Sequence, residues 1–150
     1  MKTDIFDPQA NASLQERLHQ LTAQNQPVWG RMNAAQMVLH CQKPLDVADG
    51  KLVLKRNLIG FLFGKMAKKS FLKSAEFKKN LPTAPQFKIE HDPGFEAEKQ
   101  VLLEAIRKFG TVGPKVIVNR KHPFFGTMDD HEWGVLQYKH LDHHFKQFGL

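Results

Sequence analysis

The end of the chain constrains the fold most, because it predicts one long helix that is apolar on more than one flank. This helix runs from about residue 129 to about residue 148. Thr127 or Asp129 is the expected N-cap, and Glu132 is placed for a capping box behind Asp129. Its apolar residues are Trp133, Leu136, Tyr138, Leu141, Phe145 and Phe148. A face this broad has to be covered by other helices, so the pattern predicts a helical core.

Three histidines lie on this predicted helix, at positions 140, 143 and 144. At about 100° per residue, His140 and His144 are only about 40° apart, so both imidazoles can reach one metal ion. His140 and His143 form an equally allowed i, i+3 pair, and spacing does not decide between them. Two ligands make a poor site, so a third has to come from elsewhere, and His40 is the candidate. The His-Glu-x-x-His arrangement of zinc proteases is absent.

Length and composition indicate one ordinary domain over residues 1–150, long enough to bury a core. The net charge of +7 raises the question of an anionic partner without answering it. The single cysteine, Cys41, rules out a disulfide within the chain and a cysteine-based zinc site. We expect it to be a small buried residue.

Targeting and membrane signals are weak in this sequence. The first residues lack the apolar core of a signal peptide. No apolar run approaches the roughly 20 residues that a membrane span needs. We therefore expect a cytoplasmic protein without a membrane span.

Four segments carry helical periodicity, at about 11–23, 33–48, 95–109 and 129–148. Asn11 or Ser13 is the expected cap of the first helix, Asn33 caps the second, and Gly110 closes the third. The predicted inner residues are Leu14, Leu18 and Leu21 in the first helix and Leu102, Leu103, Ile106 and Phe109 in the third. The sequence thus predicts an all-α fold, a four-helix bundle with a long crossover between its second and third helices.

Three further signals lie in the second helix and in the connections between helices. Trp29 is expected to plug one end of the core. Pro44 removes the helical partner of the His40 carbonyl, so the second helix should kink or end just past His40. Residues 111–127 read as a loop with a brief strand-like run at 116–118.

Residues 51–79 form a basic segment, with nine lysines and arginines against one acid, Glu76. They predict an amphipathic helix at about 57–69 and a helical turn at 70–77. Such a segment suits a membrane surface or an acidic partner. The favoured interpretation is simpler: its apolar face, with Phe61, Phe63, Phe71 and Phe77, packs on the bundle while its lysines face water.

Two segments resemble the signature helices of the DinB/YfiT-like superfamily of proposed metalloenzymes. They are residues 32–40 (MNAAQMVLH) and residues 140–147 (HLDHHFKQ). Within the superfamily, the chain is most similar to an uncharacterised branch that shares the HPFFG run at 122–126 and the Glu132-Trp133 pair. The resemblance covers nearly the whole chain, and only loosely residues 51–90.

This resemblance implies an up-down-down-up four-helix bundle, often a homodimer. It implies a divalent metal held by His40, His140 and His144. Neutral imidazole binds zinc, nickel, copper or iron, and zinc or nickel is the expected ion. Three neutral histidines leave coordination positions open, as in a catalytic site. Asp142 and Gln147 are candidates for hydrogen bonds that orient the imidazoles, and His122 and His131 are weaker candidates for the mouth of the site.

Two functions follow from these patterns. The first is a metal-dependent enzyme acting on a small molecule, by thiol transfer on a low-molecular-weight thiol or by hydrolysis. The second is a non-catalytic binding protein that uses residues 51–79 to contact an anionic partner. Nucleic acid is disfavoured as that partner, because no helix-turn-helix, zinc-finger or aromatic RNA-binding motif is present.

Overall fold

The computed structural model describes residues 3–55 and 58–150 and is mostly helical, as predicted. Within those ranges the α-helices are α1 (Pro8–Gln20), α2 (Ala34–Ala48), α3 (Leu58–Lys73), α4 (Phe95–Val112) and α5 (Asp130–Gln147). Two 3-10 turns, η1 (Pro85–Phe87) and η2 (Gly113–Val116), lie between them. Strands β1 (Lys121–His122) and β2 (Gly126–Thr127) form an antiparallel hairpin that the sequence did not predict.

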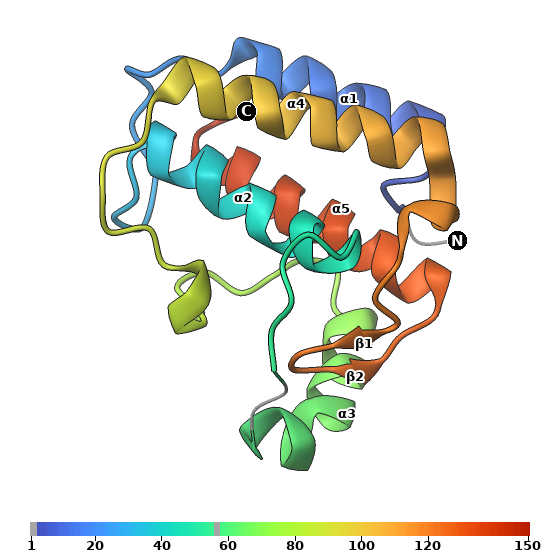
Figure 1. The fold of residues 1–150 in the computed structure, drawn as a ribbon. Coiled ribbons are helices and arrows are strands. Elements are labelled where there is room, and N and C mark those ends of the chain that lie inside the picture. The colour runs from blue at the N-terminus through green and yellow to red at the C-terminus, as the bar shows by residue number, and fades with distance from the viewer. Residues whose placement is uncertain (1–2, 56–57) are drawn as a thin grey trace.

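The core lies between α1, α2, α4 and α5, each of which contacts two or more of the others. Figure 1 shows α1 and α4 side by side, with α2 and α5 beneath them. The leucines predicted on α1 and the apolar residues predicted on α4 are buried. Trp133, Leu141 and Phe145 of α5 are fully buried as well, so the long final helix is covered as its sequence requires.

Two predicted caps are confirmed and two are wrong. Asn33 and Asp129 begin α2 and α5 with complete capping boxes. The first helix begins earlier than predicted, with Asp7 as its cap. Asn11 is instead buried inside it, where its Nδ2 donates to the carbonyls of Ile5 and Ile106 at 3.0 and 2.8 Å.

Helix α4 also continues past its predicted end. Gly110 lies inside it and faces the Asn11 side chain, where a Cβ atom would approach within 2.6 Å. The helix ends at Gly113, whose φ of 67° favours glycine. Gly110 therefore allows close packing against Asn11. The helix ends at Gly113, about one turn after the end predicted at Gly110.

Helix α2 runs through Pro44 to Ala48, which confirms its predicted bounds at about 33–48, and it does not end just past His40. Proline removes one backbone donor, and packing against α4 and α5 holds the helix together. The Pro44 carbonyl accepts a hydrogen bond from Gln137 Nε2 of α5 at 3.1 Å. The prediction of a strand-like run at 116–118 is also wrong. Val116 ends η2, and the backbone N–H of Val118 donates to the Ala48 carbonyl.

The basic segment forms one helix, α3, in place of the two predicted pieces; Asn57, its predicted first residue, lies outside the described ranges. Its apolar side chains mostly face outward, which overturns the expectation that they pack on the bundle. Phe71 is buried and Phe77 packs on the core, whereas Phe61 and Phe63 are exposed. No helix in the described part of the chain is both long and apolar enough to span a membrane.

Candidate metal centre

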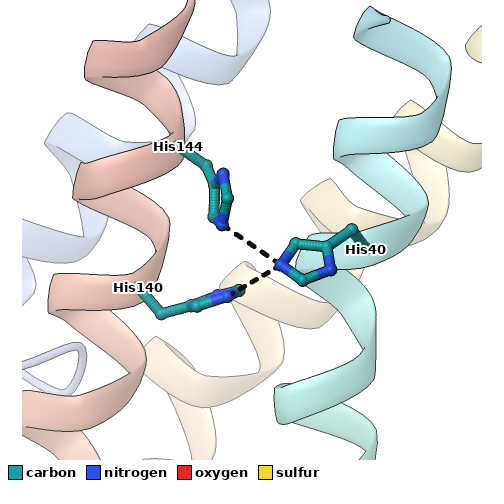
Figure 2. Close-up of side chains that lie close together, drawn as sticks. All are labelled: His40, His140 and His144. Carbon is teal, nitrogen blue, oxygen red and sulfur yellow. Dashed lines mark hydrogen bonds between the residues drawn. The ribbon is translucent and has the colours of Figure 1, made fainter. Parts of the chain in front are cut away.

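Three histidines from two helices converge on one point. His40 comes from α2, and His140 and His144 come from successive turns of α5. The Nε2 atom of His40 lies 3.1 Å from Nε2 of His140 and 3.1 Å from Nε2 of His144. Figure 2 shows the three rings pointing toward one another. One nitrogen from each lies within 4.8 Å of the others, a grouping that can hold a metal ion.

Burial keeps these imidazoles neutral. His40 and His144 are 4% and 8% exposed. Loss of hydration lowers the pKa of His40 and lowers the pKa of His144 to about 3. The pKa of His140 lies well below its ordinary value, because of burial first and the neighbouring histidines second. Neutral imidazole is the form that binds metals.

A backbone carbonyl fixes the tautomer of His40. Its Nδ1 lies 2.9 Å from the carbonyl oxygen of Phe87, in η1. A carbonyl oxygen only accepts hydrogen bonds, so Nδ1 carries the proton and donates it. In the neutral ring, Nε2 of His40 is then unprotonated, and its lone pair points toward His140 and His144.

A two-step relay fixes the tautomer of His144. Gln147 Nε2 donates to the Trp29 carbonyl at 2.7 Å, which orients the amide. Gln147 Oε1 then faces Nδ1 of His144 at 2.8 Å and accepts its proton. Nε2 of His144 is therefore unprotonated and carries a second free lone pair. The other predicted orienting residue, Asp142, does not reach the rings, because it pairs with Arg17 and Lys146.

The hydrogen bonds thus place two lone pairs face to face, on Nε2 of His40 and Nε2 of His144, 3.1 Å apart. Two acceptors at this distance repel each other unless a cation lies between them. Two nitrogens bound to one tetrahedral zinc would be about 3.3 Å apart, given Zn–N distances of about 2.05 Å. The donor set and its spacing therefore fit a transition-metal ion.

One side of the centre opens into a pocket of about 850 Å³. Four aromatic residues, Trp29, Phe77, Phe87 and Phe125, form part of its wall, and the three histidines lie in its lining. Trp29 is half-buried here and outside the core, which corrects its predicted role as a core plug. The pocket has room for a small molecule beside the three histidines.

A model of a family described as a protein of unknown function, DUF1569, matches residues 7–149. The chain belongs to the DUF1569 family. Comparison with curated proteins gives no match, and neither does comparison with solved structures. The match spans all three clustered histidines, so the site lies within the family's domain.

The remaining candidates in this DUF1569 domain have other roles. His122 lies in the pocket lining, but its Nδ1 accepts hydrogen bonds from the backbone of Phe124 and Phe125, and burial lowers its pKa to about 4. His131 is exposed and lies 3.3 Å from Asp4. Cys41 is buried against Met37, and burial raises its pKa, so it is a packing residue as predicted.

His143 is the pocket residue that spacing left open as a ligand. Its ring lies edge-on to Trp29 and Phe77, and it is absent from the cluster of converging nitrogens. The sequence did not reveal the carbonyls of Phe87 and Trp29, which orient the site. Backbone groups carry no residue-specific signal, so only the fold identifies them.

Proposed function

We propose that this DUF1569 domain is a divalent-metal-dependent enzyme, with His40, His140 and His144 as the metal ligands. The observation that carries the proposal is the pair of fixed lone pairs on His40 and His144, 3.1 Å apart with no proton available between them. Zinc and nickel are the expected metals. The proposal extends to the fold: a single-domain, up-down-down-up four-helix bundle of the DinB/YfiT-like type, made of α1, α2, α4 and α5.

The proposed substrate is a small molecule, and the reaction is thiol transfer or hydrolysis. A cation held by three neutral imidazoles supplies Lewis acidity to a thiol or a water in its open positions. The chain's own residues supply orientation, because Phe87 and Gln147 hold two of the rings. The proposed substrate for thiol transfer is a low-molecular-weight thiol.

The test is metal-dependent turnover by protein purified without a histidine tag. We expect about one equivalent of metal per chain, and activity toward a thiol-transfer or ester-hydrolysis panel that chelator removes and added metal restores. The His140→Ala variant should lose both metal and activity, while His143→Ala keeps the metal. Absence of stoichiometric metal in the wild type, or its retention in His140→Ala, refutes the proposal.

The alternative is a non-catalytic protein that binds an anionic partner through residues 51–79. The exposed apolar and basic face of α3 favours it as an additional role. A homodimer, which the resemblance implies, stays a prediction that light scattering tests.

A further inference from the structure

Helix α3 presents an apolar face to solvent. Leu58, Ile59, Leu62, Phe63 and Met66 are exposed to 73%, 63%, 62%, 51% and 69%. Single exposed apolar residues are ordinary, but a contiguous group on one element marks a binding surface. We call these five residues the α3 apolar face.

Small residues hold α3 to the rest of the protein. Gly60 and Gly64 are its buried residues near the start, and a Cβ on Gly64 would collide with the Phe124 carbonyl of the hairpin. Phe71 anchors its far end, in stacked contact with Phe125. Because the glycine side faces the protein, the side with the large apolar residues faces outward. Figure 1 shows α3 beside the hairpin, at the end of the molecule away from α1 and α4.

Three exposed lysines run beside the α3 apolar face. Leu58, Leu62 and Met66 form one i, i+4 row, and Lys65, Lys69 and Lys73 form a neighbouring row. The helix has no acidic residue between 58 and 73. The nearby Glu76 pairs with Lys146 at 2.6 Å. The surface is therefore apolar and cationic.

We propose that α3 docks this protein on an anionic lipid surface, with the α3 apolar face in the acyl boundary and the lysine row at the headgroups. The arrangement is that of an interfacial amphipathic helix: an apolar face wide enough to insert, bordered by lysines long enough to reach phosphates. A second copy of the chain is a poor occupant, because a two-fold contact brings like-charged lysine rows together and α3 supplies no carboxylates to oppose them. This inference does not depend on the metal centre.

The test is co-sedimentation of the full chain with vesicles of phosphatidylcholine, with and without about 30% phosphatidylserine. One variant, Ile59→Gln/Leu62→Gln/Met66→Gln, removes the insertion. A second, Lys65→Gln/Lys69→Gln/Lys73→Gln, removes the charge; Lys68 is kept because it pairs with Glu132 at 2.8 Å. The control Val101→Gln/Val112→Gln changes exposed apolar residues of α4.

We expect the wild type to bind anionic vesicles at least about tenfold more tightly than neutral ones, and less tightly at high salt. Both α3 variants should lose at least about tenfold in anionic binding while keeping the wild-type circular dichroism, and the control should bind as the wild type does. Absence of wild-type binding to anionic vesicles overturns the proposal, as does undiminished binding by either α3 variant. A wild-type dimer that the apolar variant converts to monomers also overturns it, because a second copy then covers this face.

Discussion

Helices α5 and α3 carry similar residue types, apolar and basic, but they meet different surroundings. The buried face of α5 contacts α1 and α2, and its His144 ring is oriented by Gln147, whose amide is held by the distant Trp29 carbonyl. Helix α3 contacts α5 and the hairpin with its glycine side and presents its large apolar residues outward. Both helices bury glycines, but α5 also buries its large apolar residues, whereas α3 exposes most of its own.

The contrast separates two kinds of recognition. The α5 site holds ring nitrogens at defined positions, which suits a small ligand with strict geometry. The α3 surface offers flexible lysines and unrestrained apolar side chains, which suit an extended, deformable partner. Substitutions in the two regions should therefore have different effects.

Replacing a clustered histidine should abolish tight metal binding. His144→Ala removes one of the two opposed lone pairs, so we expect a loss of affinity larger than the 10- to 100-fold that loss of an orienting hydrogen bond costs. His143→Ala is the matched control on the same helix and should bind as the wild type does. Competition with a chromophoric chelator measures both. Equal losses in the two variants would contradict the assignment of ligands.

The two regions should also differ in stability. Leu102→Ala creates a cavity in the α4 core and should cost about 2–5 kcal/mol of unfolding free energy. Leu62→Ala, at an exposed position of α3, should change it by no more than about 0.5 kcal/mol. Urea denaturation compares them. A comparable loss in Leu62→Ala would mean that the α3 apolar face is covered in solution.

Loss of the Gln147 hydrogen bond should lower metal affinity less than loss of a ligand does. Gln147→Met removes the acceptor for Nδ1 of His144 with little change in volume, so we expect metal affinity to fall about 10- to 100-fold. Asp142→Asn, five residues earlier on α5, should leave metal affinity unchanged, because Asp142 pairs with Arg17 and Lys146. Isothermal titration with zinc distinguishes these outcomes. An affinity loss confined to Asp142→Asn would reverse the roles assigned here.

The metal-free protein should lose stability as the pH falls below about 6.5. Burial lowers the pKa of His144 to about 3 and of His122 to about 4, so the unfolded chain takes up protons first. Each such histidine should lower the unfolding free energy by up to about 1.4 kcal/mol per pH unit between pH 6.5 and 5. Urea midpoints across this range measure the slope, which His122→Asn should reduce. A slope that His122→Asn leaves unchanged would mean that His122 is not neutral in the fold.

Much of the site could be predicted from sequence because its signals are local. The i, i+4 spacing of His140 and His144 and the capping box at Asp129 depend only on helix geometry. The tautomers could not be predicted, since they depend on carbonyls of Phe87 and Trp29, far away in the chain.

Two of the mistaken expectations share one physical cause. The large apolar residues of the basic segment were expected to pack on the bundle and Gly110 to end a helix, yet Gly64 and Gly110 lie within helices at close contacts. On α3 that reversal turns the side with the large residues toward solvent. Spacing shows which residues share a face, and only the neighbouring elements decide which face is buried.

We propose that one cation sits between the three imidazoles, and anomalous diffraction from crystals grown with one equivalent of zinc would locate it. We predict a single strong peak within bonding distance, about 2.0–2.1 Å, of Nε2 of His40, His140 and His144. A zinc peak elsewhere on the protein, with those three nitrogens still in contact and no density between them, would contradict the account.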